Sequence, residues 1–290
     1  MKNSWQLLFA ALLATPCLAV DKEADFKLQP VRTARDLASP DVATRRAAIH
    51  QFVDSLDTKY VKEYDDSLLP TIRQSLKDSD SEVRYYGFSA ARMLAHAVIL
   101  SKGRNGGRIF GRKVSIDFRN DPELEAIVKA AVSDPDPRIR TCAVSILGKA
   151  YPPTSENEKL LTKLAEGEKH PKVRREIVDG IGAGRYNSVQ ATRTLATMLD
   201  DQTEDVKGWA GFFLGQMRAK EALPKLVSKL DDDRPFVRDR ILQGIRAYGS
   251  DARTALPDLR KRRDNEKDSS GRKRLESVIQ EIEAGDKREK

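Results

Sequence analysis

Apolar positions recur along this chain in a helical pattern, and most copies of the pattern are 31 to 39 residues apart. In the clearest copies an aliphatic residue precedes a basic one, a small or apolar residue follows three positions later, and another apolar residue follows at seven. This spacing places the apolar residues on one face of a helix. The basic residues of the seven copies are Arg45, Arg84, Arg140, Arg174, Lys207, Arg238 and Arg272. A period in the low thirties predicts an α-solenoid of stacked repeats.

Each copy contains the signals of two helices. In the sixth, Pro224 stands in the first turn of one helix and Pro235 in the first turn of the next, where a missing backbone N–H costs little. The acidic run 231–233 separates the two helices and supplies capping side chains. Gly249 follows the second helix, as a terminating glycine often does. The sequence therefore predicts an all-α fold of about seven helix pairs.

An acidic residue lies six positions before most of the basic ones. These pairs are Asp78 and Arg84, Asp134 and Arg140, Glu168 and Arg174, Asp201 and Lys207, and Asp232 and Arg238. An acid at the start of a helix caps free N–H groups and meets the positive end of the helix dipole. The basic side chain can reach this acid or its counterpart in the neighbouring repeat. We expect a structural ladder of such pairs along the stack.

Two segments of this pattern resemble HEAT-repeat proteins, in particular the short repeats of phycobilisome-lyase-like members. They are residues 226–232 with Val237, Arg238 and Ile241, and residues 134–140 with Ala143, Leu147 and Gly148. The resemblance extends over residues 24–284. It implies a right-handed superhelix, in which the second helices line a concave wall and the acid–arginine pairs form the family's ladder. It implies little about activity.

A Gly- and Arg-rich insertion, residues 101–121, separates the second repeat from the third. Long loops in compact repeats are usually functional or disordered. Alternating polar and apolar residues at 113–119 predict a short strand or a hairpin arm. The candidate contacts of this basic loop with an anionic partner are Arg104, Arg108, Arg112 and Lys113. The alternative is a disordered loop that only aids solubility.

Residues 1–19 have the features of a secretory signal peptide, with Lys2, a short apolar core and Ala19 at the cleavage position. Lipidation of Cys17 and a buried N-terminal helix are the alternatives. We therefore expect an exported protein, periplasmic or secreted, with the solenoid at 20–285 and a frayed charged tail at 286–290. Cys142 would be its one remaining cysteine, either as a small apolar side chain or as a site of intermolecular pairing.

The net charge of +8 and the pI near 9.4 favour an anionic partner. For an exported protein this would be another protein or an anionic component of the cell envelope, and nucleic acid is the less expected partner. No segment after the leader is long and apolar enough to span a membrane.

Catalytic motifs are not evident in the sequence. His50, His96 and His170 lack the spacing of a zinc site, and the chain has no GxSxG motif. The glycines of 180–184 end a helix instead of connecting a strand to one, so they do not predict a dinucleotide site. We therefore expect no metal, no cofactor and no enzymatic activity.

Helical numbering places a set of large and basic side chains on the open face of the second helices. The candidate groove residues are Tyr85, Tyr86, Trp209, Phe212, Arg46, Arg175 and Arg240. Exposed aromatic residues are enriched at binding hot spots, although packing of Trp209 and Tyr86 against neighbouring segments is the alternative. The sequence thus predicts an exported, non-enzymatic interaction or scaffold protein. The alternative function is a nucleic-acid-binding or base-processing HEAT-like protein.

Overall fold

The computed structural model describes residues 22–56, 63–101, 108–109, 112–117, 120–184 and 186–285 of the 290-residue chain. Seven helix pairs form the described part. The first helices of the pairs are α2 (Lys22–Asp36), α4 (Leu69–Leu76), α6 (Pro122–Ala131), α8 (Ser155–Gly167), α10 (Val189–Met198), α12 (Leu223–Ser228) and α14 (Leu256–Asn265). The second helices are α3 (Val42–Leu56), α5 (Ser81–Ser101), α7 (Pro137–Lys149), α9 (Pro171–Ala183), α11 (Glu204–Gln216), α13 (Pro235–Ala247) and α15 (Ser269–Ala284). The expected leader, residues 1–19, and the expected tail, 286–290, lie outside the described residues.

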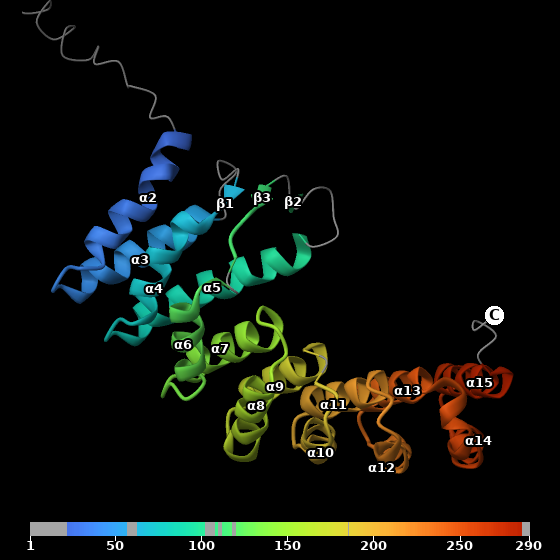
Figure 1. Ribbon diagram of the computed structural model, residues 1–290. Coiled ribbons are helices and arrows are strands. Elements are labelled where there is room, and N and C mark those ends of the chain that lie inside the picture. Colours follow the sequence, from blue (N-terminus) through green and yellow to red (C-terminus); the bar gives the residue numbers. More distant parts are fainter. Residues whose placement is uncertain are drawn as a thin grey trace, which may run out of the picture.

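The helix pairs stack side by side into a curved rod (Figure 1). Second helices of successive pairs pack against one another, from α3 with α5 to α13 with α15. They form the inner row of the arc, and the first helices from α6 to α14 form the outer row (Figure 1). The predicted all-α solenoid of about seven helix pairs is confirmed. No described helix is long and apolar enough to cross a membrane.

Local signals explain why the second helices begin and end where they do. In α7 the carboxylate of Asp136 accepts a hydrogen bond from the backbone N–H of Arg138, and Pro137 is the first helical residue. The apolar positions Ile139, Ala143 and Leu147 are fully buried. Because this stripe faces the first helix and the neighbouring repeats, each repeat stabilises itself mainly by burying surface against the next one.

Glycines allow two pairs of second helices to approach closely. A Cβ added at Gly148 would lie 2.3 Å from the Cα of Gly180, and one added at Gly215 would lie 2.1 Å from the carbonyl oxygen of Gly244. Both contacts are with backbone atoms, which cannot rotate away as a flexible side chain can. These positions therefore set the distance between α7 and α9 and between α11 and α13.

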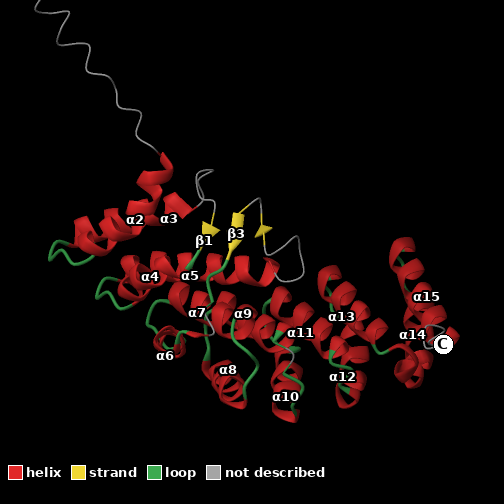
Figure 2. Ribbon diagram, turned by 45° about the horizontal axis from the view of Figure 1, so that its top comes forward, coloured by secondary structure: helices red, strands yellow, loops and turns green. Residues whose placement is uncertain are grey.

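The insertion forms a small sheet at the end of α5 (Figure 2). Strand β2 (Arg108–Ile109) pairs antiparallel with β3 (Arg112–Val114), and β1 (Glu63–Tyr64) pairs in parallel with the other edge of β3. The expected hairpin is therefore present. Its strand ends earlier than the alternation at 113–119 indicated, and residues 118–119 lie outside the described part. The two-residue strand β1 is too short to produce a recognisable pattern in the sequence.

Candidate binding groove

In the first five rungs of the ladder, the basic side chain binds the acid of the following repeat. The rungs are Arg45 to Asp78 at 2.8 Å, Arg84 to Asp134 at 3.1 Å, Arg140 to Glu168 at 2.8 Å, Arg174 to Asp201 at 2.6 Å and Lys207 to Asp232 at 3.0 Å. The arginines also donate to backbone carbonyls in their own repeat, as Arg140 does to Asp134 and Pro135 at 2.9 and 3.2 Å. Of the two possible partners, the structure therefore selects the acid of the neighbouring repeat. This explains why Ser39 can replace an acid before Arg45, because Arg45 needs only its carbonyl oxygen, at 3.0 Å.

The ladder acids have two functions at once. Glu168 accepts from the guanidinium of Arg140 and from the backbone N–H of His170 at 2.7 Å. Burial raises the pKa of Glu168, but these hydrogen bonds outweigh burial and leave the pKa below its usual value. The same balance lowers the pKa of Asp201 beside Arg174. The ladder residues are therefore committed to joining repeats and are not free to bind a partner.

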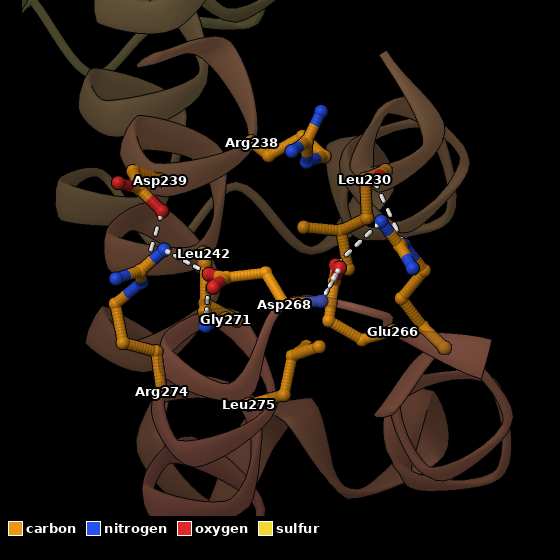
Figure 3. A pocket seen from close by; sticks show the side chains of 10 residues that line it. Leu230, Arg238, Asp239, Leu242, Glu266, Asp268, Gly271, Arg274 and Leu275 are labelled. Carbon is orange, nitrogen blue, oxygen red and sulfur yellow. Dashed lines mark hydrogen bonds and ion pairs between the residues drawn. The ribbon is translucent and has the colours of Figure 1, made fainter. Parts of the chain in front are cut away.

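The last rung of the ladder differs from the others (Figure 3). Arg238 donates to the carbonyls of Asp232 and Asp233 at 2.8 and 3.0 Å, but it forms no ion pair with a carboxylate among the described residues. Glu266, the acid of the following repeat, instead pairs with Arg262 at 2.8 Å. A cavity of about 30 Å³, room for one water molecule, separates these groups.

Asp232 likewise does not pair with Arg238 of its own repeat. The carboxylate of Asp232 binds Arg234 at 2.8 Å and Lys207 at 3.0 Å, and Arg238 contacts only its carbonyl oxygen. Hydrogen bonds from Arg234 are the main cause of a pKa of Asp232 far below its usual value. The reason is geometric, since the Arg238 guanidinium reaches the carbonyl oxygens of its own cap and not the Asp232 carboxylate.

A first cluster of aromatic and basic side chains lies on α3, α5 and α7, and we call it the tyrosine cluster. Its members are Arg46, His50, Tyr85, Tyr86 and Arg138. The rings of Tyr85 and Tyr86 meet edge to face at 5.2 Å, His50 lies 4.0 Å from the Tyr86 ring, and the Arg138 guanidinium lies 4.6 Å from the Tyr85 ring. Arg46 pairs with Asp80 at 2.8 Å and Glu82 at 3.1 Å. The two tyrosines are half-buried, so their packing leaves part of each ring accessible.

A second cluster, the tryptophan cluster, lies on α9, α11 and α13. Its members are Arg175, Trp209, Phe212, Phe213 and Arg240. The guanidinium groups of Arg175 and Arg240 lie 4.6 and 4.0 Å from the Trp209 ring, and the rings of Phe212 and Trp209 meet edge to face at 5.4 Å. Cation–π contacts of this kind are favourable and hold the side chains in defined positions. Trp209 is half-buried, so the structure combines packing against neighbours with partial exposure.

A cleft lies on the second helices, mostly further toward the C-terminal ends of α5, α7 and α9 than the cluster residues. It has a volume of about 720 Å³ and is lined by residues of α5, α7 and α9. None of the lining residues is among the groove residues that the sequence predicted. Arg92, His96 and Ile99 lie in the second half of the long helix α5, beyond the predicted Tyr85 and Tyr86. The apolar segment 94–100 was the feature of the sequence that could have predicted a longer helix here.

The basic loop is only partly described. Lys113 forms an ion pair with Glu63 at 2.8 Å across the β1–β3 pair, which reduces its availability to a partner. Arg108 lies in β2 and Arg112 in β3, and Arg104 lies outside the described residues.

Within the described part of the chain, no group of three His, Cys, Asp or Glu side chains is arranged to hold a metal ion. Cys142 is buried in α7, and burial raises the pKa of its thiol to about 11. The arrangement as a whole is suited to binding, with half-buried aromatic rings and guanidinium groups along the inner row of helices.

Comparison with known proteins identifies the repeat. A sequence model described as HEAT repeats matches residues 124–212, 157–246 and 192–280, which together span more than half of the chain. The chain is a HEAT-repeat protein. The family expected from the sequence is thereby confirmed. Among curated proteins, none matches this sequence significantly.

Solved structures align with this chain at low sequence identity. The X-ray structure of the YibA protein of E. coli aligns with a TM-score of 0.56 and 16% identity, covering 91% of this chain and 97% of that chain. A chain from the complex of CpcE and CpcF of phycocyanin lyase from Nostoc aligns with a TM-score of 0.47 and 15% identity over 87% and 94%. Human deoxyhypusine hydroxylase in complex with glycerol aligns with a TM-score of 0.39 and 16% identity over 91% and 97%. At these identities the likeness concerns the fold alone.

These structures correct one expectation. Two of them are named as a lyase and a hydroxylase. The prediction that this HEAT-repeat protein is not an enzyme is therefore wrong as an inference from fold and motifs. The missing sequence motifs exclude particular catalytic arrangements and do not exclude catalysis as such.

Proposed function

We propose that this HEAT-repeat protein is an exported binding scaffold that holds an extended, anionic segment of another protein along its inner row of helices. The observation that carries the proposal is the pair of aromatic and arginine clusters on second helices. Trp209 held between Arg175 and Arg240 is the clearest case. Aromatic and arginine side chains are the types most enriched at binding hot spots.

The charge of the protein supports an anionic partner. The chain carries a formal charge of +8, and the five ladder acids Asp78, Asp134, Glu168, Asp201 and Asp232 are all consumed by internal ion pairs. Basic side chains that are not neutralised internally would accelerate association with an acidic segment and would make its affinity depend on salt. We propose that Arg104, Arg108 and Arg112 of the basic loop add further positive charge for this partner.

A fluorescence titration tests the binding proposal directly. Trp5 and Trp209 are the two tryptophans of the chain, so the substitution Trp5→Phe leaves Trp209 as the sole reporter in the full-length protein. A synthetic peptide of alternating glutamate and leucine should change the Trp209 emission and bind more weakly as salt is raised. The matched peptide of alternating lysine and leucine should bind far less. Equal affinity for both peptides would contradict the proposed preference for an anionic partner.

Variants of the tryptophan cluster locate the site. Arg240→Gln and Phe212→Ser should weaken binding of the acidic peptide while the circular-dichroism melt changes little, because both side chains are only half-buried. Gln243→Ala is the control, since this exposed residue of α13 contacts the cluster only through a hydrogen bond to Arg240 at 3.1 Å. Unchanged affinity in both cluster variants would show that the peptide binds away from Trp209.

Export is tested separately. The proposal rests on the features of residues 1–19, and it expects the mature chain to begin after Ala19. Intact-mass measurement of the protein recovered from the cell envelope or medium would show the truncated mass. Recovery of the intact chain from the cytosol would overturn the proposed location, and a mass increased by acyl chains at Cys17 would replace cleavage at Ala19 by lipidation.

A further inference from the structure

The cleft on α5, α7 and α9 exists because α5 is longer than its neighbours. This helix has 21 residues, whereas α7 and α9 have 13 each. Its second half extends past α7 toward the small sheet in both views (Figures 1 and 2). The turns of α5 that lack a matching turn on α7 leave the cleft of about 720 Å³ open beside them. Its position on α5, α7 and α9 makes it continuous with the inner row of helices.

The floor of this cleft is apolar. Ala95 and Ile146 are almost completely buried, with exposed fractions of 3% and 1%. Met93 and Ile99 are half-buried and contribute further apolar surface. An unbranched thioether side chain such as that of Met93 adapts to ligands of different shape. The floor can therefore accept a large aliphatic or aromatic side chain.

The rim of the cleft carries a basic guanidinium and an imidazole. Arg92 and His96 are exposed on successive turns of α5 and form no hydrogen bond or ion pair with other described residues. Lys149 and Glu176 neutralise each other at 2.5 Å, and Asp179 lies 3.6 Å from the same ammonium group. Because Glu176 is paired with Lys149 and Asp179 with Arg175 at 2.6 Å, Arg92 is the charged group at the rim that has no ion pair among the described residues.

We propose that this cleft is the anchoring subsite for an acidic segment of the partner protein, with an apolar side chain on the floor and a neighbouring carboxylate on Arg92. This inference rests on the proposed function, since it names the part of the groove that selects the ligand. An extended peptide suits the cleft because α5, α7, α9 and α11 lie side by side. A chain lying in the cleft would contact α5, α7 and α9.

A crosslinking experiment tests where the apolar side chain is held. The probe is the alternating glutamate–leucine peptide with a diazirine in place of one leucine side chain. After irradiation with the full-length protein, mass spectrometry should locate crosslinks on Met93, Ile99 or neighbouring residues of α5 and α7. Crosslinks confined to other helices would overturn the proposal.

Substitution of Arg92 tests the proposed contact with a carboxylate. Arg92→Gln removes the charge at an exposed position, so the melt should not change. Loss of one charge-assisted hydrogen bond should weaken binding of the peptide about tenfold. The matched control is Arg193→Gln, an equally exposed arginine on the outer helix α10 without a partner among the described residues. An Arg92→Gln affinity equal to that of the Arg193→Gln control would overturn the proposed contact.

The outcomes distinguish the proposed anchoring subsite from the broader proposal of a binding scaffold. Binding that depends on Arg240 and Phe212 but not on Arg92 would retain the groove and refute the cleft as its anchoring subsite. Absence of any binding of the acidic peptide would refute both. Crosslinking of Met93 by a decanoate that carries a diazirine, with no binding of the acidic peptide, would show a lipid as the occupant and would also overturn the proposal.

Discussion

Arg140 of the third repeat holds the carboxylate of Glu168 in the fourth with two parallel hydrogen bonds of 2.8 Å each. The remaining guanidinium nitrogen binds two carbonyl oxygens in its own repeat. One side chain therefore joins two repeats and also closes a helix cap. Only 3% of the Glu168 side chain is exposed, so this pair lies where solvent screening is weak.

We expect Arg140→Ala to lower the free energy of unfolding by about 3 kcal/mol, because it leaves a nearly buried carboxylate without its partner. The control is Arg246→Ala. Arg246 also joins two repeats, through Glu281 at 2.6 Å, but both side chains are about half exposed. An exposed pair contributes at most about 1 kcal/mol. Urea denaturation followed by circular dichroism measures both changes. Equal losses would show that burial does not determine the strength of the ladder.

The ladder also predicts how stability depends on pH. The pKa values of Glu168, Asp201 and Asp232 are lowered in the folded protein. A group with a lowered pKa contributes stability above its unfolded pKa and loses that contribution as pH falls toward the folded value. The melting temperature should therefore drop between about pH 5 and about pH 2. Glu168→Gln should be less stable at neutral pH and show a shallower drop. A parallel pH profile for this variant would refute the role assigned to Glu168.

The last rung, in which Arg238 has no carboxylate partner among the described residues, predicts that two similar substitutions change stability unequally. Arg174→Ala removes a bidentate contact with Asp201, whereas Arg238→Ala removes only hydrogen bonds to backbone carbonyls. We expect a loss of about 3 kcal/mol in the first case and about 1 kcal/mol in the second. Chemical denaturation of the two variants under the same conditions decides the matter. A larger loss for Arg238 would mean that it pairs strongly with Glu266 or Asp268 in solution.

Close helix contact predicts that one glycine resists replacement. Alanine normally improves a helix, but a Cβ at Gly215 would lie 2.1 Å from the carbonyl oxygen of Gly244. Gly215→Ala should therefore destabilise the protein by about 1–3 kcal/mol through overpacking. Gly167, the last residue of α8, has no atom within 4 Å of its ideal Cβ position, and Gly167→Ala should cost nothing. Thermal melts of the two variants provide the comparison. Equal stability would show that α11 and α13 can separate without cost.

Helical periodicity explains how much of the fold could be predicted. Val237, Ile241 and Ile245 were assigned to a buried stripe, and all three are fully buried. Such a stripe depends on the 3.6-residue turn, which is a local property of the chain. The same reasoning placed Arg175, Trp209 and Arg240 on the open face of three successive second helices. It could not show that the two guanidinium groups lie against the indole ring, because that contact depends on the rotation between repeats.

The sequence by itself determined the helix pairs, their approximate number, their buried faces and the family, because each follows from spacing within a short segment. The tertiary structure alone decided that Arg140 pairs with Glu168 of the next repeat, that Arg238 lacks a carboxylate partner within the described part of the chain, and that a cleft opens beside Arg92. These features depend on distances between helices that are far apart in the chain. The closeness and rotation of neighbouring repeats set those distances, and backbone contacts such as that of Gly215 with Gly244 limit them.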